Sequence, residues 1–476
     1  MARWMRKSLL VVSIVVAVIA LWIGVILVRW YSATPTITFH PADIYRKDYV
    51  ENQPGDRAWE ALSRLGSGRL RPLVGSALEA KFPMGFNDET FADGVAFVKE
   101  REAELGVIRE AAGRKVLGYP FQFDDAKINA DPPESELRSH LPYTQVLRDA
   151  FRLLVADSRA AFHEGDSKRL FENLHAMLNF TELMWNTPGQ GAMQNSGFLI
   201  AAAGNLLDEL SAKQWKGCSD QQIDSLLNHL TTLRVNDFRM SLDELRRLSK
   251  DHIQRVFTDD GNGDGRVGEA GSTHIANVLG WPEERRSAWR FEMLRASLPS
   301  RREATQLVEE MLGQAQGWLD EVPWKRGAAS FARKTKSRSK DGYLELCTGV
   351  AIELSVLPQV VQMNCNADMR RHAARIVLAA EVHRRKTGAL PESLEQLREA
   401  LGGELPVDVF TGEPLKYSVK DGRVLVYSVG NDRDDDGGRE LPGIDAYKAG
   451  MWCLVGDAKM VDADFVIFQG SSDNGE

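Results

Sequence analysis

The chain has 476 residues, a formal net charge of −8, 43% hydrophobic residues and 26% charged residues. This length corresponds to about two to four domains, and the composition is that of a globular protein with a sizeable core. The acidic excess argues against nucleic acid as a partner, because phosphate binding needs a basic face.

The first predicted element is a transmembrane helix over residues 8–29. This stretch is almost wholly apolar and follows three basic residues, Arg3, Arg6 and Lys7. About 20 apolar residues span a bilayer core, and the basic residues should keep residues 1–7 in the cytoplasm. A signal peptide cleaved near Ala33 is the alternative, although its apolar run would be shorter. We therefore expect a single-pass protein of the bacterial inner (cytoplasmic) membrane, held in the lipid bilayer through residues 8–29, with its bulk in the periplasm.

A helical region follows the anchor. Residues 30–57 are rich in Pro, Thr, Asp and Asn and predict a linker. Residues 58–330 predict a helical domain, because apolar residues recur at helical spacing between short polar breaks. The expected helices are 56–65, 87–112, 144–166, 167–185, 197–210, 219–233 and 240–257, with two more inside 281–322. Consecutive helices with short connections predict a helical array.

The C-terminal region has a different pattern. Residues 331–366 predict a linker and a connecting helix, and residues 367–476 predict a small α+β domain that opens with a helix ending at Gly388. Two runs rich in Val, Tyr and Leu surround a Lys-Asp-Gly turn and predict a β-hairpin, and 464–470 predicts another strand. The expected fold is therefore mainly α, with a transmembrane helix, a helical array and a small α+β C-terminal domain.

Residues 260–271, with the sequence DGNGDGRVGEAG, resemble an EF-hand calcium loop. Its oxygen ligands would come from positions one, three, five and seven, which are Asp260, Asn262, Asp264 and Arg266. Gly265 would make the sharp turn at position six. Position twelve is Gly271 instead of an acid, so Glu269 would have to replace it and calcium affinity should be weak. A solvated turn between helices is the alternative.

A second acidic loop lies at residues 430–438, with the sequence GNDRDDDGG. Asp432, Asp434 and Asp436 alternate along it. Crowded carboxylates repel one another unless a cation or solvent screens them. The loop therefore predicts either a second calcium site or a solvated turn.

The segment around this loop, roughly residues 370–445, resembles the C-terminal domain of the major pseudopilins of type II secretion. In that family a helix leads into a Gly–Pro segment, a D-x-x-x-G-x-P-x-x-Y stretch, a hairpin and a Y-S-x-G-x-D signature that opens a calcium-binding loop. The matching residues are Gly388, Pro391, Leu394, Asp408, Gly412, Pro414, Tyr417, Tyr427, Ser428, Gly430, Asp432 and Gly437. Pseudopilins carry their membrane helix directly before this domain, whereas here it lies far upstream. The whole layout is similar to large membrane-anchored proteins of planctomycete-type bacteria, which often end in such a segment.

No HExxH, GxSxG, Walker or strand-linked GxGxxG motif is present, so we expect no enzymatic activity. The four cysteines contain no CxxC pair. They are either small buried apolar residues or disulfide partners whose pairing stays open: Cys218, Cys347, Cys365 and Cys453.

The expected function is a membrane-anchored structural or interaction protein of the bacterial cell envelope, with calcium as a candidate cofactor and an envelope protein as partner. Two alternatives stay open. One is an extracytoplasmic hydrolase whose catalytic residues converge only in the fold. The other is an accessory subunit of a secretion or pilus-like assembly.

Overall fold

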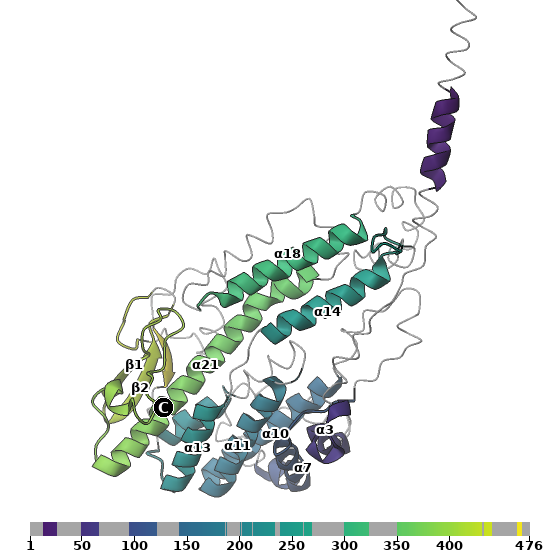
Figure 1. The fold of residues 1–476 in the computed structure, drawn as a ribbon. Coiled ribbons are helices and arrows are strands. Elements are labelled where there is room, and N and C mark those ends of the chain that lie inside the picture. The colour runs from purple at the N-terminus through teal and green to yellow at the C-terminus, as the bar shows by residue number, and fades with distance from the viewer. Residues whose placement is uncertain are drawn as a thin grey trace, which may run out of the picture.

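The described part of the chain is mainly helical, with one small antiparallel sheet, as the sequence predicted (Figure 1). The computed structural model describes residues 13–25, 49–65, 95–120, 142–185, 187, 200, 202–211, 213–233, 239–259, 261–268, 299–322, 350–430, 433–439 and 464–468. The helices are α3 (Ala58–Leu62), α7 (Glu102–Ala112), α10 (Pro142–Glu164), α11 (Ser167–Trp185), α13 (Asp220–Thr232), α14 (Arg239–Val256), α18 (Arg301–Asp320) and α21 (Val350–Thr387). Residues 202–211 form a further helical segment.

Part of the predicted membrane segment lies within the described residues. Residues 13–25 are helical (Figure 1), and all their large apolar side chains, from Ile14 to Val25, are exposed. Among the described helices, none is both long enough and apolar enough to cross a membrane.

Polar residues cap the N-terminal ends of α13 and α18. Ser219 and Gln222 form a capping box at the start of α13, and Ser300 and Glu303 form another at the start of α18. Each box satisfies backbone N–H groups that the first turn of a helix cannot pair internally. The left-handed backbone of Gly388, with φ of 86°, follows the last residue of α21, as predicted.

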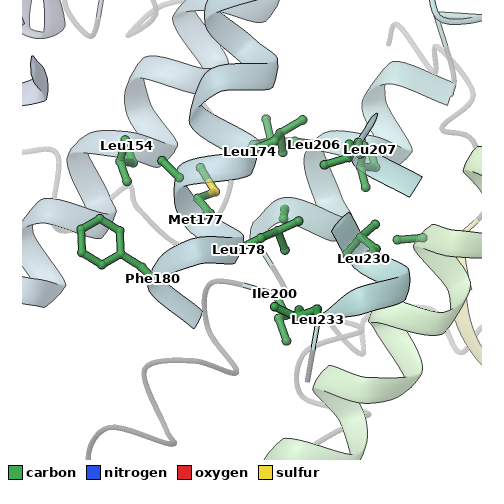
Figure 2. Close-up of a cluster of buried hydrophobic side chains, with 14 of the residues drawn as sticks. Leu154, Leu174, Met177, Leu178, Phe180, Ile200, Leu206, Leu207, Leu230 and Leu233 are labelled. Atoms are coloured by element: carbon green, nitrogen blue, oxygen red, sulfur yellow. The ribbon is translucent and has the colours of Figure 1, made fainter. Parts of the chain in front are cut away.

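The first hydrophobic core joins helices that are mostly consecutive in the chain. α3 packs on α7, α7 and α10 pack on α11, α11 packs on α13, and α13 packs on α21. Figure 2 shows the centre of this core, formed by Leu154, Leu174, Met177, Leu178, Phe180, Ile200, Leu206, Leu207, Leu230 and Leu233. Neighbours in sequence are therefore neighbours in space over this region.

A second hydrophobic core lies between α14, α18 and the N-terminal part of α21. It contains Leu245 and Phe257 from the α14 side, Leu312 from α18, and Leu357 and Val361 from α21. The C-terminal part of α21 belongs to the first core. α21 runs unbroken over Val350–Thr387, so the boundary expected between residues 366 and 367 lies inside a single helix.

The sheet contains the predicted hairpin and the predicted third strand. β1 (Lys416–Lys420), β2 (Arg423–Ser428) and β3 (Phe465–Phe468) pair antiparallel in the order β1-β2-β3. Asp421 and Gly422 connect β1 to β2 with positive φ values of 52° and 73°, the backbone that a two-residue hairpin turn requires. β2 and β3 both contact α21, which places the sheet against the C-terminal end of that helix.

A buried ion-pair network connects α7, α10 and α11. The fully buried carboxylate of Asp157 accepts hydrogen bonds from Arg109 at 2.5 Å and from Asn173 at 2.6 Å, and Arg169 lies 3.0 Å away. Arg109 also donates to the Asn173 side chain at 2.9 Å. Two guanidinium groups therefore compensate a single carboxylate that has left water.

Replacing Asp157 with Ala should lower the free energy of unfolding by about 1.5–3 kcal/mol, because Arg109 and Arg169 lose their buried partner and keep only the more exposed carboxylates of Glu102 and Glu164. Chemical denaturation followed by circular dichroism measures this loss. Asp243→Ala is the matched control, since that side chain is 66% exposed and pairs with Arg246 on the surface of α14. Its effect should stay within about 1 kcal/mol. Equal losses in the two variants would contradict a structural role for the buried network.

Candidate metal centre

The second acidic loop lies between the end of β2 and the start of β3. Residues 433–439 run from the end of the hairpin to Arg439, whose carbonyl accepts a hydrogen bond from the Asp464 backbone N–H at 3.2 Å. Asp464 directly precedes β3. In return, the Asp464 carboxylate accepts a hydrogen bond from the Gly438 N–H at 2.7 Å. Pairing of the sheet thus brings Asp464 to a loop 26 residues earlier in the chain.

Three partners compensate the charge of the Asp435 carboxylate. It accepts hydrogen bonds from the Tyr427 hydroxyl at 2.9 Å and the Gly437 N–H at 3.1 Å, and it pairs with Lys416 Nζ at 3.0 Å. Burial alone raises the pKa of Asp435, but Lys416, Tyr427 and Gly437 outweigh burial and lower it. Asp435 is therefore an anchor that attaches the loop to β1 and β2.

Asp436 and Asp464 each have one carboxylate oxygen that no hydrogen-bond donor of the described residues reaches. Asp436 pairs through Oδ1 with Arg439 at 2.9 Å, whereas its Oδ2 is buried and has no hydrogen-bond partner among the described residues. Asp464 is 6% exposed, and its Oδ1 is likewise buried with no hydrogen-bond partner in the part of the chain that the structure describes. Burial raises the pKa of Asp464, the charges of Asp435 and Asp436 raise it further, and the N–H groups of Gly438 and Asp436 oppose the shift.

Buried carboxylate oxygens without donors are the ligand type that a hard cation prefers. Calcium takes 6–8 oxygen ligands, including main-chain carbonyls and water as well as carboxylates. Within the described ranges, no three His, Cys, Asp or Glu side chains are grouped so that they could hold a metal ion. Of the predicted ligands, Asp434 and Asp436 are described, and Asp432 lies outside the described residues.

Asp464 is a candidate ligand that the sequence did not reveal. It was expected as the first residue of a strand, and an aspartate beside an apolar run carries no ligand signal by itself. Only the pairing of β3 with β2 brings it next to the loop. The two carboxylates that now stand out are Asp436, which was predicted, and Asp464, which was not.

The EF-hand-like loop has a different geometry. Asp264 Oδ1 accepts hydrogen bonds from the Gly265 N–H at 2.9 Å and the Arg302 N–H at 3.1 Å. Burial raises the pKa of Asp264, but these two backbone donors outweigh it and lower the pKa. Asp264 thus acts at the N-terminal turn of α18, where backbone N–H groups and the helix dipole stabilise a negative charge. Asp260 and Glu269 lie outside the described residues.

Main-chain oxygens of this loop also contact protein groups. The Arg266 carbonyl accepts hydrogen bonds from the Thr258 N–H at 2.8 Å and the Thr258 hydroxyl at 3.1 Å. The Asn262 carbonyl lies 3.4 Å from the Arg302 guanidinium. The Arg266 carbonyl, the main-chain oxygen that would point at calcium in an EF-hand, is therefore used in contacts within the protein.

The predicted sharp-turn glycine, Gly265, is required for a close approach between backbones. A Cβ atom at this position would lie 2.0 Å from the Thr258 carbonyl oxygen. The residue therefore lets the loop fold back on the end of α14.

Gly265→Ala should lower the free energy of unfolding by about 1–3 kcal/mol, because the added methyl group forces two backbone segments apart. Gly313→Ala is the matched control on α18, where a Cβ would meet nothing within 4 Å. That change should raise stability by about 0.5–1 kcal/mol, because alanine favours the helix. Thermal melting measures both changes, and a neutral Gly265→Ala would contradict the close approach.

Two residues that match the pseudopilin pattern have structural roles here. The buried carboxylate of Asp408 accepts hydrogen bonds from the Phe410 N–H at 2.8 Å and the Val429 N–H at 3.1 Å. Tyr417 donates to the Pro391 carbonyl at 2.8 Å. These contacts fasten the hairpin to the segment that follows α21.

Comparison with known proteins adds no family to this geometry. No family model, no curated protein and no solved structure matches the chain. The functional argument therefore depends on the residues and contacts described above.

Proposed function

We propose that this protein is a membrane-anchored structural or interaction protein of the bacterial cell envelope, stabilised by calcium at the loop of residues 433–439. The observation that carries the proposal is the pair of buried carboxylate oxygens on Asp436 and Asp464, neither of which has a hydrogen-bond partner within the described ranges. Burying an uncompensated charge is costly, so a cation at this place would relieve a real energetic penalty.

Calcium would act by joining two parts of the C-terminal sheet. Asp436 belongs to the loop after β2, and Asp464 belongs to the start of β3. A cation bound to both carboxylates would cancel their mutual repulsion and hold β3 against the hairpin. The surface formed by the loop would then be available, in one conformation, to an envelope protein.

The calcium proposal predicts that calcium raises the melting temperature of the full chain in detergent and gives a saturable calorimetric signal. Extracellular modules bind calcium with dissociation constants on the order of 0.1–1 mM, so the titration should extend above that range. Asp464→Asn should abolish both responses, because it removes the charge but keeps the size of the side chain. Asp421→Asn, at the turn of the same hairpin, is the matched control and should leave both responses unchanged.

Without calcium, Asp464→Asn should not lower the melting temperature. The raised pKa of Asp464 means that its favourable contribution is complete below its ordinary pKa of 3.8 and is lost as the pH rises through the raised value. In EDTA at neutral pH, Asp464→Asn should therefore melt at the same or a higher temperature than the wild type. A wild-type protein that does not respond to calcium would overturn the proposal.

The membrane anchor is the second part of the proposal. It is supported by the uncharged apolar stretch within residues 8–29 and by the exposure of every large apolar side chain in the helical residues 13–25. Exposed apolar surface of this extent is unfavourable in water and favourable in lipid. The basic residues before the stretch favour an orientation with the bulk of the chain outside the cytoplasm.

A pair of charges inside the stretch tests the anchor. The double variant Val18→Lys, Ile19→Lys should move the protein out of the carbonate-washed membrane fraction, because each central lysine disfavours insertion by about 2.5–3.5 kcal/mol. Val50→Lys is the control, since Val50 is also exposed but lies outside the apolar stretch. A wild-type chain that alkaline carbonate removes from the membrane would contradict the anchor.

A further inference from the structure

A pair of histidines connects α11 to α13, away from both acidic loops. His175 Nδ1 and His229 Nδ1 lie 2.7 Å apart, and both side chains are half-buried. The ring planes differ by only 11° and the ring centroids are 5.0 Å apart. The ring centroids are farther apart than the two Nδ1 atoms by roughly one ring diameter, so each Nδ1 atom lies on the line between the centroids. The two rings therefore meet edge to edge through these atoms, nearly in one plane.

This geometry is that of one linear N–H···N hydrogen bond. One imidazole donates its Nδ1–H, and the other must keep its Nδ1 unprotonated to accept. A single added proton can be taken up at an Nε2 atom without breaking the bond, and Ser225 Oγ lies 3.4 Å from His175 Nε2. A second added proton must enter the bond itself, because it would place two N–H groups against each other. The pair therefore tolerates one positive charge and not two.

Other charged groups near these two helices are engaged elsewhere. On the α21 side of α13, Arg371 donates to the Leu230 carbonyl at 2.9 Å and Arg375 to the Thr231 hydroxyl at 3.2 Å. Asp368 pairs with Arg371 and His372 on α21 itself. The acidic neighbours of the pair along its own helices, Glu172 on α11 and Asp224 on α13, are exposed to solvent, which screens their charge.

We propose that His175 and His229 form a pH-sensitive latch that holds α11 against α13 and opens when both imidazoles are protonated. The latch joins two helices of the first core through a bond that persists while the pair carries at most one positive charge. It is independent of calcium and of the anchor. An extracytoplasmic protein would experience such a change when the external medium becomes acidic.

The direction of the pKa shifts agrees with this geometry. Burial lowers the pKa of His175, and burial together with the charge of His175 lowers the pKa of His229 to about 4. His229 lies in the last turn of α13, where the helix dipole favours a positive charge, so burial and the partner imidazole outweigh that effect. The folded-state pKa values lie below the ordinary value of 6.5, so the stabilisation is complete above pH 6.5 and is lost as the pH falls toward 4.

Hydrogen exchange of the full chain in detergent, read by mass spectrometry at pH 7.5 and pH 5, tests the latch. With exchange rates corrected for pH, protection of α11 and α13 should fall by about 30-fold at pH 5, the population change that follows from moving the pKa of one histidine from 6.5 to about 4. Protection of α14 and α18, which form the second core, should change much less. A uniform loss in all four helices would indicate general acid unfolding and would overturn the latch.

His229→Gln gives the sharpest comparison, because glutamine can still donate to His175 Nδ1 but cannot be protonated. Its α11 and α13 peptides should lose much less protection at pH 5 than those of the wild type, because only the burial of His175 still opposes protonation. His175→Gln should show a weaker pH response than the wild type, because the charge of His175 is gone while burial still lowers the pKa of His229. His383→Gln removes an imidazole near the end of α21 and should keep the wild-type pH response. An unchanged pH response in His229→Gln, or none in the wild type, would overturn the proposal.

Discussion

The described parts of the structure depend on the contacts along α21, the one helix shared by both hydrophobic cores. Its N-terminal part packs with α14 and shares a hydrophobic core with α14 and α18, and its C-terminal part packs with α13 and the sheet (Figure 1). Two buried arginines of α21 set its position. Arg371 donates to the Leu230 carbonyl of α13 at 2.9 Å, and Arg375 donates at 2.6 Å to the carbonyl of Leu401, in the segment that follows α21. A shift of α21 along its axis would break these bonds and misplace the sheet.

Buried carboxylates in this protein are compensated by arginine in one region and not in another. Glu381, near the end of α21, accepts from Arg384 at 2.7 Å and from Arg385 at 2.6 Å. Asp157 is similarly paired, in the first core. Asp464 has backbone donors on one oxygen only. The calcium proposal rests on this oxygen, because a buried carboxylate oxygen without a donor or counter-charge is costly.

The local features of the fold were predictable because they depend on neighbouring residues. The Asp421–Gly422 turn, the stop at Gly388 and the helices α10, α11 and α13 follow from turn chemistry and apolar spacing. The length of α21 did not follow. Pro358 lies inside this helix, where proline removes a backbone hydrogen bond and usually predicts a break. The helix continues because the residues on either side of that position, Leu357 and Val361, are buried against α14 and α18.

The two acidic loops show why a metal site is harder to predict than a turn. Both contain aspartates alternating with glycine or other polar residues, and the sequence assigned both the same chemistry. In the first, Asp264 meets the N-terminal turn of α18, which supplies backbone donors. In the second, Asp436 meets Asp464 from a strand far along the chain, which supplies another negative charge. Composition determines how many carboxylates a loop holds, whereas the element that packs against it determines whether they need a cation. The loop after β2 is therefore the stronger candidate, and the reason lies in β3.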